Sequence, residues 1–217
     1  MPKITSVQPQ KKNPHRFNIF LDDKFAFGAD EDLVVNRRLV VGKEIDPQLL
    51  EKLVFEAEVG KLIERMYRLF SVRSRSEKEV RDYLKQLSFK RKLKDKEEIS
   101  QLAINFLIER LKQKGMLNDT QFAQNWVSSR SKKKGKVAIK MELMKKGLSR
   151  EVINESLGQI RDEDEIKLAQ QTLERKLKNW INLPQMEFRK KAYDFLLRRG
   201  FEFEIVKSII EKYIQKG

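Results

Sequence analysis

Clusters of lysine and arginine are the residues of this sequence best suited to chemistry with a partner. Three dense basic runs occupy residues 73–75, 90–94 and 130–136. Guanidinium and ammonium groups donate charge-assisted hydrogen bonds to phosphate and carboxylate oxygens, so clustered cations indicate a polyanionic partner. The alternative is a solvated surface that only aids solubility, although solubility does not require clusters of one sign.

The positive charge is unevenly distributed along the chain. The 217 residues include 47 Lys+Arg and 32 Asp+Glu, which gives a formal net charge of +15. Residues 59–161 hold +14 of this charge, whereas residues 1–58 carry −1 and residues 162–217 carry +2. This asymmetry favours one basic surface that faces nucleic acid or an acidic protein.

Residues for catalysis or metal binding are scarce. The sequence has no Cys and one His, which excludes thiol nucleophiles, Cys-ligated zinc and two-His zinc motifs. His15 lies in a basic, turn-like stretch and is expected to be solvated. A Mg²⁺-dependent nuclease needs converging carboxylates, but the acids at 22–23, 30–32 and 162–165 are typical of turns and helix starts that face water. We expect no enzymatic activity, no cofactor and no metal site.

Membrane and export signals are also missing from the sequence. No apolar run approaches the roughly 18 residues that a membrane span needs. The N-terminal residues contain no signal-peptide core. We therefore expect a soluble, cytoplasmic protein with no membrane partner.

The first segment of the chain, residues 1–58, is predicted to contain a small sheet. Residues 16–27 form two short β-rich runs joined by two turn-forming residues, Asp22-Asp23, which predicts a hairpin. Residues 4–7 are expected to add a third strand, and residues 30–38 to form a short helix.

From Pro47 onward the spacing of apolar residues becomes helical. No proline occurs between Pro47 and Pro184, which permits long helices. Apolar residues then recur at intervals of three and four, as on the buried face of a helix. The clearest such stripe is expected to consist of Ile99, Leu102, Ala103, Phe106, Leu107 and Leu111.

A layout repeated three times indicates an α-helical array. Each copy has two apolar residues four apart, then a small residue and a bulky apolar residue, as at a helix C-terminus. The copies are Val80 and Leu84 with Ser88-Phe89, Ile139 and Leu143 with Gly147-Leu148, and Ala192 and Leu196 with Gly200-Phe201. Ser76 with Glu79 forms a capping box, and Asp119 and Ser149 can cap later helices. The expected bounds are 1–58 for the N-terminal segment, then 59–117, 118–161 and 162–217 for three three-helix repeats.

The predicted helix around residue 140 has apolar residues on two arcs. Val137, Met141 and Met144 lie on one arc and Ile139 and Leu143 on the other. Two apolar arcs suggest contacts with two neighbours. Either both arcs pack between adjacent repeats, or the methionine arc contacts a partner protein.

Together, the repeated motifs resemble a known family. The bacterial RecX regulatory proteins have three repeat signatures, and three stretches of this chain are similar to them in order. The first is residues 75–80 with Leu84, the second is residues 117–123 followed by Arg130, Gly135, Leu143 and residues 146–148, and the third is residues 198–201. Asn118, where the family often has an acid, and the long basic loop after Phe89 depart from that pattern. The resemblance implies a mainly α protein of tandem three-helix repeats in an elongated curved array.

The resemblance also implies a function. RecX-like proteins bind RecA recombinase filaments along the helical groove, usually inhibit ATP hydrolysis and strand exchange, often bind DNA, and are not enzymes. By this resemblance we expect a monomeric regulator of recombination and DNA repair whose partners are the RecA filament and DNA. An independent DNA-binding protein is the alternative.

The expected contacts to the filament or DNA are basic residues in predicted loops and at helix ends. Arginine matters most where bidentate phosphate or carboxylate geometry is needed. Because few aromatic residues are expected at the surface, a platform that stacks single-stranded bases is disfavoured. The expected contact residues are Arg73, Arg75, Arg81, Arg130, Lys132, Lys133, Lys134, Lys136, Lys140, Arg198 and Arg199.

Overall fold

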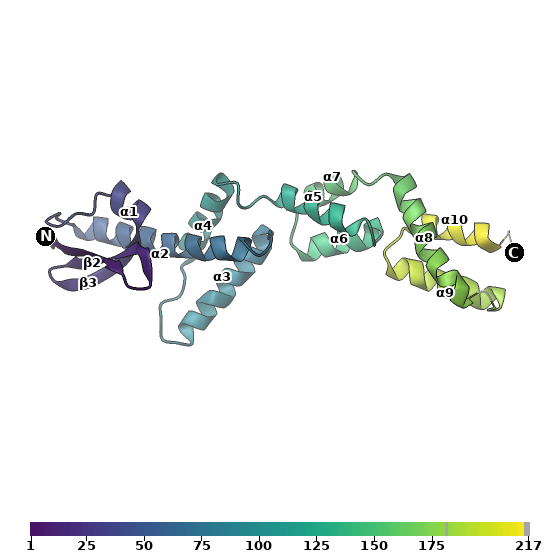
Figure 1. Ribbon diagram of the computed structural model, residues 1–217, viewed down its shortest axis with the longest axis horizontal. Helices are drawn as coiled ribbons and strands as arrows, with labels where there is room; N and C mark the ends of the chain where they lie inside the picture. Colours follow the sequence, from purple (N-terminus) through teal and green to yellow (C-terminus); the bar gives the residue numbers. More distant parts are fainter. Residues whose placement is uncertain (181, 215–217) are drawn as a thin grey trace. The chain divides into compact units, whose positions relative to one another are not determined.

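The structure, a computed structural model, describes residues 1–180 and 182–214. Ten helices and three strands make up the secondary structure of these described residues (Figure 1), and none of the helices found there is long and apolar enough to cross a membrane. The chain divides into two compact units, called here the first unit (Met1–Ser74 with Arg81–Leu117) and the second unit (Arg75–Val80 with Asn118–Gly217). The prediction of a mainly α chain of three-helix repeats with a small β segment is confirmed.

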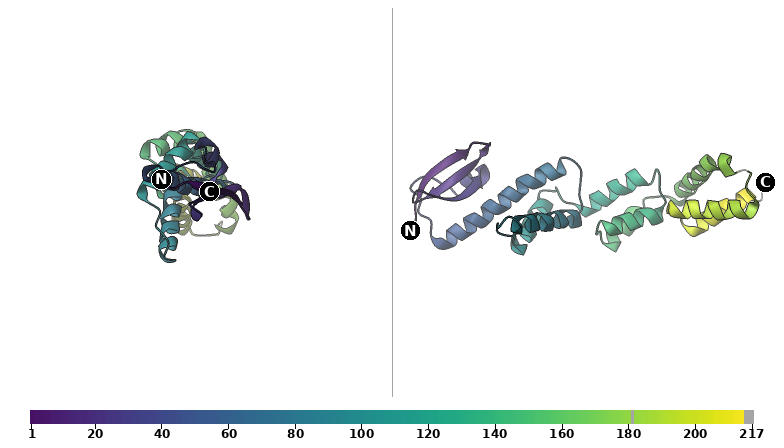
Figure 2. Two further views of the ribbon diagram at one scale, coloured as in Figure 1. Left: turned by 90° about the vertical axis from the view of Figure 1, so that its left-hand side faces the viewer. Right: turned by 90° about the horizontal axis from the view of Figure 1, so that it is seen from below.

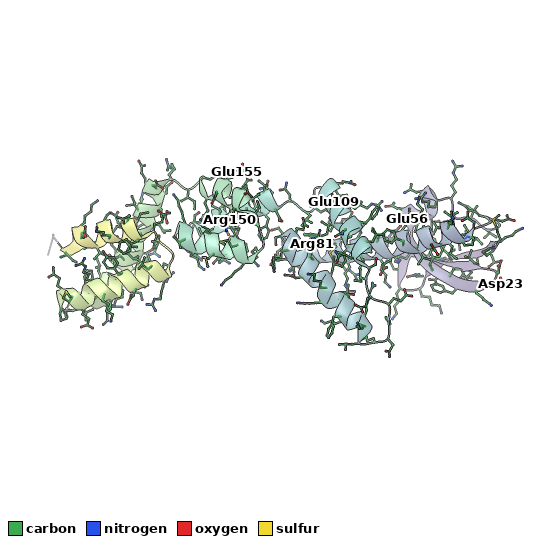
Figure 3. The ribbon with its side chains drawn as sticks, turned by 180° about the vertical axis from the view of Figure 1, so that it is seen from behind. Asp23, Glu56, Arg81, Glu109, Arg150 and Glu155 are labelled. Carbon is green, nitrogen blue, oxygen red and sulfur yellow. The ribbon has the colours of Figure 1, made fainter. Side chains whose placement is uncertain are left out.

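An antiparallel sheet forms at the N-terminus of the first unit. Strand β2 (Asn13–Leu21) pairs with β3 (Lys24–Asp30), and β1 (Ile4–Gln10) joins the other side of β2. Asp22 and Asp23, the latter labelled in Figure 3, have φ values of 44° and 64°. Such a left-handed pair is typical of a type I′ turn, whose twist matches the flanking strands. The predicted hairpin and third strand are confirmed.

One face of the sheet packs against the long helix α2 (Pro47–Phe70), as Figure 2 shows. Ile19 from β2 and Leu53 from α2 are fully buried in this core. The helix also approaches the end of β3 closely, because a Cβ atom on Gly60 would lie 2.1 Å from Oδ2 of Asp30. A side chain at residue 60 would therefore force the Asp30 carboxylate to move.

Two aspartates set the helix starts of the N-terminal segment. Oδ1 of Asp30 accepts a hydrogen bond of 2.8 Å from the backbone of Leu33, at the start of α1 (Glu31–Asn36). Asp46 caps α2 in the same way. The predicted short helix is confirmed, whereas the expected bound at residue 58 falls inside α2, so the sheet segment and the first repeat share one helix.

Helix α3 (Glu77–Lys92) differs from its predicted layout. It was expected to end at Ser88, with Phe89 packing back onto it. Instead the helix continues to Lys92, Phe89 is 61% exposed, and the Ser88 hydroxyl accepts a hydrogen bond from the backbone of Ile99. The expected end was wrong because serine lacks the ease with which glycine adopts left-handed geometry.

The buried stripe of α4 (Gln101–Gln113) lies one residue further round the helix than predicted. Ala103, Ile104, Leu107, Ile108 and Leu111 are buried. Leu102 and Phe106, which were expected in the core, are 69% and 44% exposed. The Phe106 ring packs nearly perpendicular to the Phe55 ring of α2, at 5.7 Å between centroids, and this side of α4 lies at the margin of the core.

The second unit holds two three-helix groups (Figure 1). Their helices are α5 (Asp119–Arg130), α6 (Lys136–Lys145) and α7 (Arg150–Leu157), then α8 (Asp162–Trp180), α9 (Gln185–Arg198) and α10 (Phe203–Ile214). Residues 215–217, the end of the expected third repeat, lie outside the described residues. Each group has its own buried cluster of apolar side chains.

Glycines end the middle helix of both groups as predicted. Gly147 and Gly200 have φ values of +79° and +83°, in the left-handed region that favours glycine. The residues that follow them, Leu148 and Phe201, are buried, and each donates a backbone hydrogen bond back to its helix. These C-terminal caps confirm the repeated motif for α6 and α9.

Candidate interaction surface

The predicted contact residues fall on three stretches of chain. In the second unit the structure brings two of these stretches together, since the loop before α6 lies against the end of α9. The backbone N–H of Gly135 donates to the carbonyl oxygen of Arg199 at 3.1 Å, and that of Val137 donates to Gly200 at 3.0 Å. A Cβ atom on Gly135 would lie 2.3 Å from the Gly200 oxygen. Arg198 and Arg199 therefore border the basic loop 131–135, and both side chains are exposed.

Two of the predicted contact residues are engaged inside the molecule by Glu142. Nε of Arg130 lies 3.3 Å, and Nζ of Lys134 2.5 Å, from the Glu142 carboxylate. The indole N–H of Trp126 donates to the same carboxylate at 2.8 Å, and the Arg130 guanidinium lies over the Trp126 ring. Burial would raise the pKa of Glu142, but the hydrogen bonds from Lys134 and Trp126 and the nearby charges outweigh burial, so this pKa is lowered.

Lys136 is also occupied, and it joins α6 to the first turn of α8. Its Nζ atom lies 2.5 Å from Oδ1 of Asp162 and 3.7 Å from Oε2 of Glu165. Burial would lower the pKa of Lys136, but the hydrogen bond to Asp162 and the nearby carboxylates outweigh it, so the pKa is raised. Glu165 is buried, and burial raises its pKa. Lys136 therefore forms internal ion pairs that a partner anion would have to compete with.

Three of the predicted lysines remain available to a partner. Lys132, Lys133 and Lys140 are exposed, and none of them forms an ion pair within residues 1–180 and 182–214. A partner anion does not have to displace an internal carboxylate to reach them. Of the basic loop and α6, these three side chains are the ones best placed for binding.

An apolar face of α6 lies beside Lys140. Val137, Met141 and Met144 are 45%, 53% and 46% exposed, whereas Ile139 and Leu143 are buried in the core. Packing within the group of α5, α6 and α7 therefore accounts for the arc of Ile139 and Leu143, and the methionine arc stays exposed. A flexible methionine side chain adapts well to a partner surface.

The predicted contacts near the start of α3 are tied to local structure. The guanidinium of Arg81, which is labelled in Figure 3, donates to the side chain of Asn105 on α4 at 2.9 Å. Arg73 donates to the carbonyl oxygen of Ser74. Arg75 is half-buried. Arg81 is also half-buried, whereas Arg73 is exposed.

The beginning of α3 is held by residues of the second unit. The predicted capping box is present, since the Ser76 hydroxyl accepts from the backbone of Glu79 at 3.3 Å while Glu79 accepts from that of Ser76 at 3.4 Å. The Ser76 hydroxyl also donates to the Lys146 carbonyl oxygen at 2.7 Å.

Asp119 was expected to cap α5, but Asn118 caps this helix, and Asp119 instead accepts a hydrogen bond from the backbone N–H of Glu77. Ser149 caps α7 as predicted.

Glu142 and Glu165 organise the basic surface but were missed as functional residues. Glu142 is the one acid between residues 120 and 150, and a lone carboxylate among many cations was a usable signal of pairing. No such signal existed for Glu165, because its partner lies 29 residues away.

The carboxylate clusters serve structural roles. Asp30 and Asp162 engage a helix start and a lysine as described above, and the His15 ring lies 3.2 Å from Glu31. Among the described residues, no group of three or more His, Asp or Glu side chains is placed to hold a metal ion. Nothing in this part of the chain resembles the converging carboxylates of a metal-dependent nuclease.

Comparison with known proteins identifies the same family over three stretches of the chain. Residues 2–46 match the regulatory protein RecX N-terminal domain. Residues 118–157 match the second and residues 162–210 the third three-helix domain of RecX. The regulatory protein RecX of Bacillus subtilis is 37% identical over 214 residues, which cover 98% of this chain and 77% of that protein. The Bacillus velezensis protein of the same name is 36% identical, with 98% and 78% coverage.

Solved structures share this fold. A crystal structure of regulatory protein RecX has a TM-score of 0.79 and 23% identity, and covers 97% of this chain and all of its own. RecX from Lactobacillus salivarius has a TM-score of 0.62 and 23% identity, with coverage of 71% and 95%. At this identity the structures support the fold, while the closer sequence relatives and the three matched domains establish the family. The chain belongs to the RecX family of regulatory proteins.

Proposed function

We propose that this chain is a non-enzymatic regulator of homologous recombination and DNA repair that binds RecA recombinase filaments in their helical groove. Binding inhibits the ATPase and strand-exchange activities of the filament. The family relationship supports a regulatory role, since the curated relatives are named regulatory proteins. The protein acts as a monomer in the cytoplasm, where the filament and its DNA lie.

The observation that carries this proposal is the mixed face of the second unit. Lys132, Lys133 and Lys140, which form no ion pair with any other residue that the structure describes, lie on the same loop and helix as the exposed Val137 and Met141. The lysines suit acidic protein side chains or the phosphates of filament DNA. The apolar side chains gain from contact with protein but not from contact with phosphate.

Charge reversal at the three available lysines tests this assignment. The variant Lys132→Glu, Lys133→Glu, Lys140→Glu leaves Lys134 in place to hold Glu142. We expect inhibition of the RecA ATPase on single-stranded DNA to weaken by about tenfold or more, because one close charge pair contributes roughly 1.5 kcal/mol or more.

A matched control carries the same change of charge elsewhere on the second unit. Lys178, Lys207 and Lys212 are exposed on α8 and α10, and their reversal to Glu should leave inhibition near the wild-type level. If the first variant inhibits as well as the control, the proposed contact surface is wrong.

An independent DNA-binding protein is the second candidate, because the same three lysines also suit phosphates. Salt titration of DNA affinity with and without recombinase filaments separates the two functions. A steep salt dependence with no added affinity for filaments over naked DNA favours the second candidate. Met141→Ser sharpens the test, since it should weaken binding to filaments while leaving affinity for naked DNA unchanged.

A further inference from the structure

A basic groove lies in the first unit, apart from the surface described above. It has a volume of about 1090 Å³ and is bordered by β2 and β3, by α2, and by the C-terminal end of α3 with the residues that follow it. The cations without an ion pair in the described structure are Lys61, Arg65, Arg68, Lys90, Lys94 and Lys96. Of these, only Lys90 and Lys94 lie in a basic run that the sequence made conspicuous.

Most of the negative charge in the groove is already neutralised. Oε1 of Glu58 lies 2.5 Å from Nη1 of Arg91. Oε1 of Glu64 lies 2.7 Å from Nη1 of Arg16, whose other nitrogen donates to a carbonyl oxygen of β3. Glu97, the third acid of the lining, is exposed. The two ion pairs therefore leave the unpaired cations as a positive excess.

The pKa of Lys61 is lowered within this cluster of positive charges. Burial lowers its pKa, and the charges of Arg16, Arg91 and Lys96, with that of Arg65, lower it further. Like charges that repel one another in the free protein are stabilised when a polyanion enters. The groove thus favours a ligand that carries several negative charges.

An aromatic side chain completes the wall of the groove. Phe25 of β3 is 59% exposed and meets the Phe20 ring only edge-on, at 6.0 Å between centroids. Leu93, which is 69% exposed, borders the same groove. The expectation that few aromatic residues reach the surface does not hold at Phe25. The register shift between Ile19 and Phe20 pairs Phe25 with Phe20, whereas Phe27 pairs with the buried Ile19. The exposed part of the Phe25 side chain is available to a planar partner.

We propose that this groove binds single-stranded nucleic acid, with backbone phosphates on Lys61, Lys94 and Lys96 and a base stacked on Phe25. Unpaired cations along a groove together with an exposed ring are the combination that single strands require. The bases of a duplex are already stacked on each other and cannot reach Phe25. An acidic peptide would pair with the lysines but would leave the ring without a partner. This site is separate from the proposed filament contact on α6.

Fluorescence anisotropy of a labelled oligothymidylate, with the full chain and no recombinase, tests the lysines. We expect Lys61→Glu with Lys94→Glu to weaken binding by about tenfold or more and to reduce the salt slope by about 1.4, for two lost phosphate contacts. The matched control, Lys52→Glu with Lys85→Glu, reverses two exposed lysines of α2 and α3 that lie outside the groove. Equal affinity of the two variants overturns the proposal.

A second variant tests the ring. Phe25→Ala removes an exposed side chain, so the melting temperature should change little, whereas affinity for the oligonucleotide should fall about fivefold or more. Unchanged affinity, or competition by poly-glutamate as strong as that by unlabelled oligonucleotide at equal charge, contradicts the base-stacking groove and indicates an acidic protein ligand. No recombinase is present in these assays, so their outcome does not affect the separate test of the filament contact on α6.

Discussion

The backbone N–H of Lys136 donates a hydrogen bond to the Glu165 carboxylate, 2.8 Å away. Helix α6 begins after Gly135, which has no side chain to accept from the first turn. Glu165, in the first turn of α8 and 2% exposed, supplies the missing acceptor from 29 residues further along the chain. A carboxylate of one three-helix group therefore caps a helix of the preceding group.

We predict that Glu165→Ala destabilises the second unit. The substitution leaves the half-buried N–H of Lys136 without the Glu165 acceptor, which costs about 1–3 kcal/mol. Urea unfolding followed by circular dichroism measures the loss. Glu163→Ala, an exposed acid in the same turn of α8, is the control and should change the free energy of unfolding by less than about 0.5 kcal/mol. Equal effects would show that the cap contributes nothing.

Glu142 is expected to make stability depend on acid pH. Its pKa in the folded protein is below its ordinary value of 4.5. Its ionised form therefore stabilises the fold above the unfolded pKa, and this contribution is lost as the pH falls through the folded pKa. We expect Glu142→Gln to reduce the free energy of unfolding near neutral pH and to reduce it less as the pH falls below 4.5. Urea titrations across this range measure the difference, and a constant difference contradicts the prediction.

The features that were predicted from sequence depend on local chemistry. Two β-rich runs around Asp22-Asp23 predicted the hairpin, and Gly147 and Gly200 predicted two helix ends, because a turn or a left-handed residue is specified by its own neighbourhood. Ser88 shows the limit. It occupies the matching place in the first repeat, but no local rule stops a helix at serine, and the hydrogen bond from Ile99 is visible only in three dimensions.

The internal partners of the basic residues could not be predicted from the sequence. Charge density located the basic loop, but it could not distinguish Lys133, which faces solvent, from Lys134 and Lys136, which hold carboxylates. Pairing depends on which acid the fold brings near, and the sequence order does not give that. For the same reason Lys61, an isolated lysine in the sequence, was not recognised as part of a cluster.

Gly200 is expected to tolerate no side chain. A Cβ atom there would lie 2.2 Å from that of Ala138, and the residue has a φ of +83°. Gly115 has a similar φ of +67°, but a Cβ atom on it would meet no neighbouring atom within 4 Å. Gly115→Ala therefore measures the cost of the backbone conformation alone, about 1–2 kcal/mol. We expect Gly200→Ala to lower the free energy of unfolding by clearly more than Gly115→Ala. Equal losses in urea unfolding would mean that the contact with α6 relaxes freely.

The ion pair between Glu79 and Lys146 is expected to hold the start of α3 against the end of α6. Oε1 of Glu79 lies 2.5 Å from Nζ of Lys146, and the side chains are 15% and 24% exposed. Lys146 also lies over the Trp126 ring, 5.1 Å from its centroid. Because both side chains are mostly buried, water screens this ion pair only weakly, and we expect a coupling energy of about 1–2 kcal/mol.

A double-mutant cycle of Glu79→Gln and Lys146→Met measures this coupling in urea. The exposed pair of Glu109 and Lys112 on α4, with side chains 64% and 44% exposed, serves as the reference and should give less than about 0.5 kcal/mol. Hydrogen exchange locates the effect, because loss of the buried pair should raise exchange rates at residues 77–80 while leaving those of α4 unchanged. If the two cycles give the same coupling, burial adds nothing to the Glu79 pair, and the capping box with the Ser76 bond to the Lys146 carbonyl holds this helix start alone.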